Sequence, residues 1–519
     1  MSSFPRYLPE ELGDAVVRSR AALPEALGAL HNLIWQLTGR EPDYESVKHV
    51  STFWLMHLCD LWSHALNIAE DSMFKMPKET VYTVMSDVQT SEDDTQRRLA
   101  LLVHLIIEGS IGSLELEDEA LLGMRTRHSQ RRSLLLSRIS PDSNPVMVTM
   151  PYLKVSALAE FRAAFSLREL LHWDYIQVDD PPDSSLNSLG RLSFARAAMS
   201  GTDNYRQIRA AVALTVPKDL AENYWKFRES VSQRIETPRL IYTANAHQTS
   251  TAFMHFSSVA RNRGSKLLIH QHGGGYGIDA HHLGEDHDIG VSDIFYSFGW
   301  VRKDLPHKVK PLPAPMPPHT KQQNREVLLV SLEATQSLYR LQAFCMPSHV
   351  ARALDLTREF LTTLDESISL KFRHAPGRPI PRSILQVSRA NITEDLGSEP
   401  ATIVASRSAL AVHNYLGTSW LETLALNIPT VCFFDPKMFY PRNDARSALD
   451  SLARVGILHS SGRSAARFVN TLSNQPLHWW YSDEVQDVRS EFTSRFANFS
   501  TDWLRSWERE FRELLERDT

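Results

Sequence analysis

Apolar residues recur at helical spacing through the first part of the chain. They fall three or four positions apart over residues 12–37 and 47–69, and residues 97–108 form a further apolar stretch. This spacing places the apolar side chains on one face of a helix, which can then pack against a core. We therefore expect residues 1–140 to form a helical part of the first domain.

From residue 145 onward the pattern alternates between strand and helix. Alternation of this kind is typical of a parallel sheet covered by helices. It predicts an α/β region over residues 141–308, which completes a first domain at 1–308. The segments with these patterns are strands at 146–150, 240–243 and 266–271 and helices at 154–172 and 249–263.

A proline-rich segment interrupts the alternation. Residues 309–318 read VKPLPAPMPP, with five prolines in ten residues, a composition that excludes a helix or a central strand. We interpret 309–325 as a linker, 326–475 as a second α/β domain and 476–519 as a helical tail rich in Trp and Phe. The expected elements of the second domain are strands at 326–331, 369–373, 402–404 and 430–434 and helices at 348–364 and from Ser419.

Composition narrows the class of protein. A chain of 519 residues should form two or more domains, and 42% hydrophobic and 23% charged residues are ordinary for a globular protein. The net charge of −5 argues against a nucleic-acid partner. The three cysteines are far apart, as in a reduced protein, and the first residues lack the apolar segment of a signal peptide. No apolar run is long enough to span a membrane. We therefore expect a cytoplasmic protein.

The most informative stretch is KLLIHQHGGGYG, at 266–277. A loop that leaves the carboxyl end of a strand is where open α/β sheets bind ligands, and glycines let the backbone approach a ligand closely. His272 stands at this exit and could bond an anion or protonate a leaving group. Gly273, Gly274 and Gly275 could offer N–H groups to the same anion. The alternative is a tight turn with a surface histidine.

A second candidate site follows in GEDHDIGVSD, at 284–293. Glu285 or Asp286 could act as a general base, with His287 as its orienter or as a second base. The alternative is a solvated acidic turn. A metal site is another alternative, but no fixed pair of ligands at helical spacing is present, and we expect no required metal. The cluster of metal-ligand types comprises His281, His282, Glu285, Asp286, His287 and Asp288.

The third block is HNYLGTSWLETLALNIPTVCFFDP, at 413–436. Gly417, Thr418 and Ser419 stand where a loop becomes a helix. One interpretation is a capping box, in which Ser419 and Glu422 each satisfy a backbone N–H. The other is a phosphate site, formed by the free N–H groups and positive end of the helix.

These blocks, together with TANAHQTSTAF at 243–253 and FGW at 298–300, resemble one family in their order and spacing. The family comprises transferases encoded in bacterial O-antigen and surface-polysaccharide gene clusters, and the resemblance covers residues 239–436. It implies a GT-B-like α/β fold, in which two Rossmann-like domains face a cleft and a C-terminal helix crosses back to the first domain. This family resembles glycosyltransferases that include enzymes moving Kdo-like acidic sugars from CMP donors.

The resemblance implies an inverting glycosyltransferase that uses a nucleotide-activated sugar. Its acceptor would be a surface glycan or a lipid-linked acceptor, reached at the inner face of the cytoplasmic membrane. Two alternatives stay open: a glycerol-phosphate-type transferase on a related scaffold, and a non-catalytic binding protein, because the motif that usually opens the family is not found here. The expected catalytic residues are His272, Glu285, Asp286 and His287. The expected donor-binding residues are Gly273, Gly274, Gly275, Arg373, His374, Asn414, Gly417, Thr418, Ser419 and Glu422, with Glu422 on the ribose.

Overall fold

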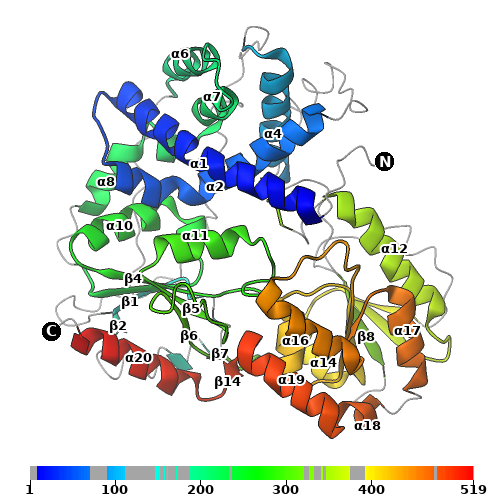
Figure 1. The fold of residues 1–519 in the computed structure, drawn as a ribbon. Coiled ribbons are helices and arrows are strands. Elements are labelled where there is room, and N and C mark those ends of the chain that lie inside the picture. Colours follow the sequence, from blue (N-terminus) through cyan, green and yellow to red (C-terminus); the bar gives the residue numbers. More distant parts are fainter. Residues whose placement is uncertain are drawn as a thin grey trace.

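Two α/β domains lie beside each other in the computed structural model, and a layer of helices covers the first (Figure 1). Each domain contains a six-stranded sheet in which every strand pair is parallel. The predicted class, with two Rossmann-like domains facing each other, is confirmed. The described residues are 9–70, 91–111, 146–151, 153, 157, 160–161, 171–172, 186–232, 237–320, 326–331, 340–342, 347–373, 392–472 and 476–517.

The N-terminal region is helical, as its apolar spacing predicts. Long helices α1 and α2 pack along each other and bury residues such as Leu30 and Leu58 completely or almost so. Further helices from residues 188–232 pack against them on the same side of the first sheet (Figure 1). The helices of this layer are α1 (Pro9–Thr38), α2 (Tyr44–Glu70), α4 (Ser91–Glu108), α6 (Ser188–Met199), α7 (Arg206–Thr215), the 3-10 helix η1 (Lys218–Leu220) and α8 (Tyr224–Ser232).

The first sheet has the strand order β2-β1-β3-β4-β5-β6. Residues 157, 160 and 161 are helical, whereas 171–172 form a short strand, so the predicted helix over 154–172 is wrong at its end. The remaining residues of that helix lie outside the described part. The elements are β1 (Val146–Thr149), β2 (Leu171–His172), β3 (Leu240–Thr243), α9 (Ala246–Thr249), α10 (Thr251–Asn262), β4 (Lys266–His270), α11 (Leu283–Val291), β5 (Ile294–Ser297) and β6 (Val309–Pro311).

The two faces of this sheet are covered by different parts of the chain. Residues such as Ile241 and Phe295 point into the core beneath the N-terminal helices. Their neighbours in the strands, such as Tyr242 and Tyr296, point to the other face and into a second cluster. Side chains alternate in this way because successive residues of a strand face opposite sides of the sheet.

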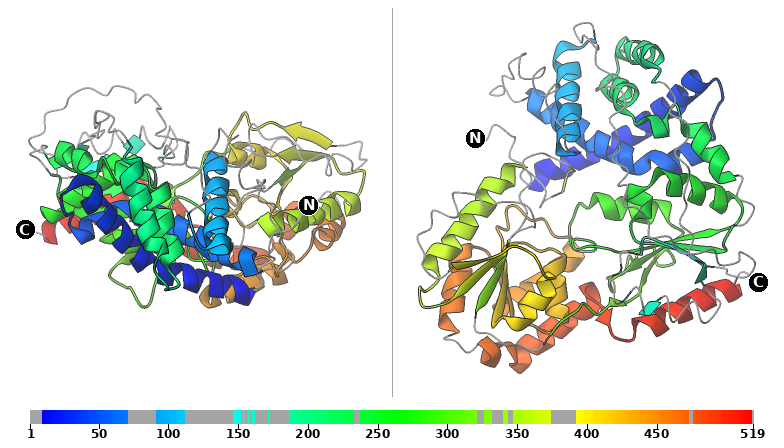
Figure 2. Two further views of the ribbon diagram at one scale, coloured as in Figure 1. Left: turned by 90° about the horizontal axis from the view of Figure 1, so that it is seen from above. Right: turned by 180° about the vertical axis from the view of Figure 1, so that it is seen from behind.

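The chain crosses between the two domains twice. The segment interpreted as a linker contains the edge strand β6, which pairs with β5, and then β7 (Ala314–Pro315). β7 pairs with β14 (Phe499–Ser500), so the outgoing and returning chains lie side by side. After this second crossing, α20 (Trp503–Arg517) lies along the face of the first sheet opposite α10 and α11 (Figure 2).

The second sheet has the order β10-β9-β8-β11-β12-β13. The predicted strand at 402–404 is wrong, because these residues belong to α14, whose Val404 and Ala405 pack on the sheet. A segment of three residues is too short to distinguish a strand from a helix. The elements are β8 (Val327–Val330), α12 (Pro347–Thr363), β9 (Leu370–Arg373), β10 (Ile392–Asp395), α14 (Ala401–Arg407), β11 (Leu410–His413), α15 (Thr418–Ala425), β12 (Thr430–Phe433), α16 (Asn443–Arg454), β13 (Leu458–His459), α17 (Gly462–Thr471), α18 (Pro476–Trp480) and α19 (Asp483–Phe496).

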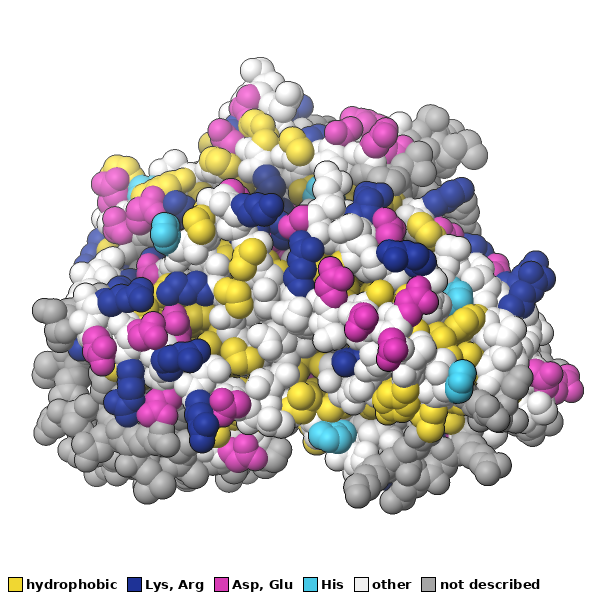
Figure 3. Space-filling model, turned by 60° about the horizontal axis from the view of Figure 1, so that its bottom comes forward, with side chains coloured by type: hydrophobic (Ala, Val, Ile, Leu, Met, Phe, Trp, Pro, Cys, Tyr) yellow, Lys and Arg dark blue, Asp and Glu magenta, His cyan; other side chains and the backbone are white. Residues whose placement is uncertain are grey.

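The surface agrees with the modest net charge of the chain. Cationic and acidic side chains are intermixed over both domains on the face that Figure 3 shows. Among the described residues, no helix combines the length and apolar content that a membrane-spanning segment requires.

Candidate functional site

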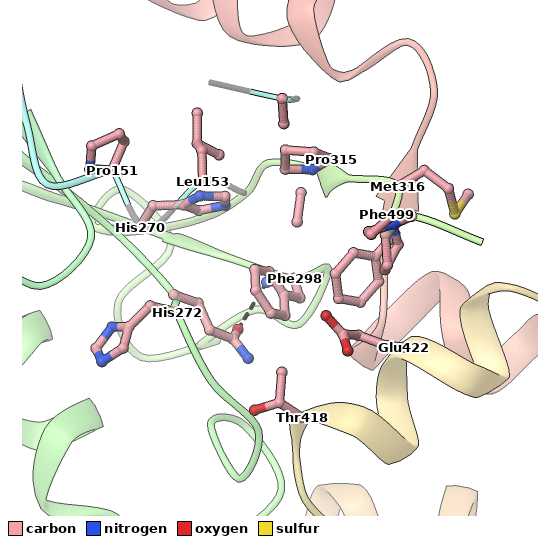
Figure 4. Close-up of a pocket in the computed structure, with 15 residues that line it drawn as sticks. Pro151, Leu153, His270, His272, Phe298, Pro315, Met316, Thr418, Glu422 and Phe499 are labelled. Atoms are coloured by element: carbon pink, nitrogen blue, oxygen red, sulfur yellow. Dashed lines mark hydrogen bonds between the residues drawn. The ribbon is translucent and has the colours of Figure 1, made fainter. Parts of the chain in front are cut away.

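A cavity of about 340 Å³ lies where the two domains meet (Figure 4). Its walls come from the loops at the carboxyl ends of β1, β4 and β5, from the crossing segments and from α15. This is the edge at which parallel α/β sheets place their ligands. The lining residues are Pro151, Leu153, Ala157, His270, Gln271, His272, Phe298, Ala314, Pro315, Met316, Pro317, Pro318, Thr418, Glu422 and Phe499.

The glycine loop of the first domain touches the beginning of α15 in the second. The backbone N–H of Gly274 donates a hydrogen bond of 2.8 Å to Oγ1 of Thr418. A Cβ atom on Gly274 would lie only 2.8 Å from the carbonyl carbon of Gly417 and from the nitrogen of Thr418. Gly274 therefore permits a backbone-to-backbone approach between two motifs that lie more than a hundred residues apart.

The rest of this loop is also bonded to the second domain. The N–H of Ala280 donates to the carbonyl of Tyr440 at 2.7 Å, and the N–H of Arg442 donates to the carbonyl of Ile278 at 2.8 Å. Gly277 has a φ of +71°, and a Cβ there would collide with the Trp300 ring. The loop predicted to bind a ligand is thus also a contact between the domains.

His272 lines the cavity, as its position after β4 predicts. Its ring extends away from Thr418 and Glu422 (Figure 4) and lies 5.8 Å from the ring of Tyr276. Burial lowers the pKa of His272 to about 4 against a smaller opposing effect of Asp288. The imidazole is therefore neutral at neutral pH and able to accept a proton.

The two carboxylates expected as bases lie elsewhere. Glu285 is buried in the first turn of α11, where it accepts from the N–H of Gly277 at 2.7 Å and from Arg442 at 2.6 Å. Asp286 points to the other side of α11, is 47% exposed and pairs with Arg20 at 3.3 Å. Neither residue lines the cavity that His272 lines.

Asp288 connects three of the sequence motifs. Its carboxylate accepts hydrogen bonds from His247 at 2.6 Å, Gln248 at 2.9 Å, Tyr276 at 2.9 Å and His287 at 3.1 Å. Burial alone would raise the pKa of Asp288, but His247 and His287 lower it below its usual range. The carboxylate therefore holds the loops after β3 and β4 against α11.

Sequence reasoning named His287 and Asp288 as possible metal ligands, but it missed the hydrogen bonds that join Asp288 to His247, Gln248 and Tyr276. His247 and Gln248 lie in TANAHQTSTAF, Tyr276 lies in QHGGGYG, and Asp288 follows His287 directly. Of the described residues, His247, His287 and Asp288 form a group with metal-ligand atoms within 4.8 Å of one another. Within this group, the carboxylate of Asp288 accepts a hydrogen bond from each of the two histidines.

Of the two interpretations of the Gly417–Ser419 segment, the capping box is wrong. α15 begins at Thr418 with Gly417 as its N-cap, and no side chain caps it. Ser419 and Glu422 therefore lie inside the helix, and Glu422 points its carboxylate into the cavity beside Phe298 and Phe499 (Figure 4). Gly417 packs against the Tyr415 ring, and a Cβ atom at this position would collide with it.

The other expected donor-binding residues have structural partners. Asn414 is buried and donates to Thr357 at 2.9 Å and to Ser331 at 3.1 Å. Arg373 pairs with Asp395 at 2.7 Å. His374 lies outside the described residues.

Comparison with known proteins gives a family and several distant structural similarities. The profile described as "LIC12162 family transferase" matches residues 53–511, whereas no protein of curated function matches the sequence. The fold is similar to that of the calicheamicin glycosyltransferase CalG4, with 10% identity over 72% of this chain and 91% of that chain and a TM-score of 0.33. It is also similar to MurG of Acinetobacter baumannii, with 10% identity over 72% of this chain and 99% of that chain and a TM-score of 0.36. Similarities this low carry no inference about the reaction.

Proposed function

The chain belongs to the LIC12162 family of transferases, and we propose that it is a glycosyltransferase. In this proposal it moves a sugar from a nucleotide-activated donor, such as a CMP-linked Kdo-like acid, to a surface glycan or a lipid-linked acceptor. The donor binds mainly to the second domain and the acceptor to the first. The enzyme works at the inner face of the cytoplasmic membrane.

One observation carries this proposal. The glycine loop after β4 and the beginning of α15 come from the carboxyl ends of two parallel sheets, and they meet at the cavity through the bond from Gly274 to Thr418. Both sheets thus present their ligand-binding edges to one space. A donor with a nucleotide and a sugar has two parts, which suits a site with a wall from each domain.

The beginning of α15 is proposed to hold the donor phosphate. Its first N–H groups have no partner within the helix and no side-chain cap, and they carry partial positive charge. Thr418 adds a hydroxyl group at the cavity. Glu422, one turn further along, is proposed to accept hydrogen bonds from the ribose hydroxyls.

His272 is proposed as the general base, in place of Glu285 or Asp286. In the transfer step the acceptor hydroxyl attacks the anomeric carbon, and its proton passes to the neutral imidazole of His272. The bond from the anomeric carbon to the phosphate oxygen breaks, and the nucleotide leaves with the electron pair. A single displacement of this kind inverts the anomeric centre, and we assign no metal to it.

A panel of nucleotides tests the proposal. CMP, UDP, GDP and CDP-glycerol are added to the protein, and its thermal unfolding is followed. A nucleotide at 100 times its dissociation constant adds about 2.7 kcal/mol of stability. Stabilisation by CMP or UDP supports a sugar donor, stabilisation by CDP-glycerol alone supports a glycerol-phosphate transferase, and no stabilisation by any nucleotide refutes donor binding.

A further inference from the structure

The side-chain amide of Gln271 lies at the wall of the cavity between the domains. Gln271 directly follows β4, is 2% exposed and lines the cavity together with Thr418. It takes no part in the proposed transfer step. The polar groups of a buried amide normally have hydrogen-bond partners, and the partners of Gln271 show which part of the site it holds in place.

The oxygen of this amide is fixed by two donors. Oε1 accepts a hydrogen bond of 2.9 Å from the backbone N–H of Phe298 and one of 2.8 Å from the indole N–H of Trp300. Both partners can only donate, so the oxygen and not the nitrogen of the amide must face them. The nitrogen is therefore turned toward the glycine loop, where it donates to the carbonyl of Gly273 at 2.8 Å.

That carbonyl belongs to the peptide unit that joins Gly273 to Gly274. The N–H of the same unit donates to Oγ1 of Thr418 at 2.8 Å. A peptide unit is planar, and in the trans form its C=O and N–H point in opposite directions. By fixing the carbonyl, Gln271 in the first domain therefore also directs the N–H toward Thr418 in the second.

The hydroxyl group of Thr418 is left with a proton to donate. A threonine hydroxyl has one proton and two lone pairs, and the N–H of Gly274 occupies one lone pair. In the part of the chain that the structure describes, no group accepts the proton. Thr418 lines the cavity (Figure 4), so a ligand there can accept it, and a charged oxygen makes the strongest bond of this kind.

The three hydrogen bonds would then run in one direction. Gln271 donates to the peptide unit, the peptide unit donates to Thr418, and Thr418 donates to the ligand. Bonds in such a chain polarise one another, so the donating end faces the ligand. We infer that Gln271 is a positioning residue for the donor phosphate, on which it acts through this peptide unit and the Thr418 hydroxyl. The identity of the ligand as a donor phosphate rests on the proposed function.

A double-mutant cycle tests the inference. Gln271→Met removes the amide and keeps an unbranched side chain, and Thr418→Val removes the hydroxyl and keeps the branched shape. CMP and UDP are titrated by calorimetry into the wild type, both single variants and the double variant, and so are cytidine and uridine, which lack the phosphate. Gln486→Met is the matched control, because Gln486 on α19 also donates to a backbone carbonyl, that of Trp480 at 2.8 Å.

The expected result is a loss of affinity that depends on the phosphate and on Thr418. Gln271→Met should weaken nucleotide binding about fivefold, and Thr418→Val about tenfold or more, because its hydroxyl bonds a charged group. The double variant should bind no more weakly than Thr418→Val, since Gln271 acts through that hydroxyl. Nucleoside binding should be the same in all variants, and Gln486→Met should bind nucleotides as the wild type does.

A second variant serves if thermal unfolding shows that Gln271→Met does not fold. Gln271→Glu keeps an oxygen for Phe298 and Trp300 and loses only the N–H donated to Gly273. Nucleotide binding should weaken at neutral pH and return toward the wild-type affinity at the same pH as the pH is lowered. The reason is that burial favours the protonated carboxyl, which can donate to the Gly273 carbonyl.

The inference is overturned if the effects of the Gln271 and Thr418 variants add, if nucleosides lose as much affinity as nucleotides, or if low pH does not restore binding in Gln271→Glu. A purely structural role of Gln271 would give the first two of these results. If neither nucleotide binds to the wild type, the proposed function fails and the inference fails with it. Nucleotide binding with additive effects would overturn the inference alone.

Discussion

Substitution of Gly274 by alanine tests whether the contact between the glycine loop and α15 builds the donor site. The added methyl carbon would lie 2.8 Å from backbone atoms of Gly417 and Thr418. Non-bonded carbon atoms prefer about 3.5–4.0 Å, so the second domain must retreat by roughly 0.7 Å or more. Gly274 has no positive φ, so alanine adds no backbone strain there.

The magnitude follows from two contributions. Overpacking costs about 1–3 kcal/mol, and the bond from Gly274 to Thr418 is worth about 1 kcal/mol. The domain arrangement that brings the two walls of the cavity together should therefore become less stable by about 2–4 kcal/mol. A donor that needs both walls should bind roughly 30- to 800-fold more weakly.

Calorimetric titration of the stabilising nucleotide measures this effect, and Gly273→Ala is the control. A Cβ on Gly273 would lie 3.7 Å from Oγ1 of Thr418, an ordinary contact, so this variant should change the binding free energy by less than about 0.5 kcal/mol. The reasoning is refuted if Gly274→Ala and Gly273→Ala bind the nucleotide equally well.

Further variants distinguish residues that take part in the transfer reaction from residues that stabilise the fold. His272→Ala should reduce the transfer rate by about 10²–10⁴-fold without lowering the melting temperature. The wild-type rate should also fall as the pH drops toward about 4, where the imidazole of His272 becomes protonated. A flat pH profile would exclude His272 as the base. Glu422→Gln should weaken nucleotide binding by about 1.5–3 kcal/mol in calorimetry, and unchanged affinity would remove the ribose role. Glu285→Gln breaks a buried pair with Arg442 and should lower the free energy of unfolding by about 3–5 kcal/mol in urea. The exposed Asp286→Asn should change it by less than about 1 kcal/mol. Equal stabilities would contradict this distinction, and loss of transfer in either folded variant would restore the carboxylate as the candidate base.

Much of the fold could be predicted because apolar spacing reports directly on burial. The parallel strands at 240–243 and 266–270 and the long N-terminal helices are found where the pattern places them. The failures concern short segments. The short segment at 402–404 fits a strand as well as a helix, and the structure makes it a helix that packs against the second sheet.

The candidate site was predictable as a set of motifs but not as a geometry. The sequence indicates that His272 lies at the end of a strand and that the Gly417–Ser419 segment lies where a loop becomes a helix. His272 and Thr418 both line the cavity. The sequence does not show that Gly274 packs on Gly417, or that the buried Asp288 bonds side chains from the loops after β3 and β4. Such contacts depend on how the domains and loops pack, which no local pattern contains.

A ribosome makes this protein in an order that leaves the first domain unfinished until the end. The strands of its sheet are complete at Pro311, but the aromatic residues that cover one face, Trp503, Trp507 and Phe511, follow roughly 190 residues later. At about 5–20 residues per second, that face stays uncovered for roughly 10–40 s during synthesis. We expect the nascent chain to need a holding chaperone in this interval, and loss of the last helix to damage the domain that is made first.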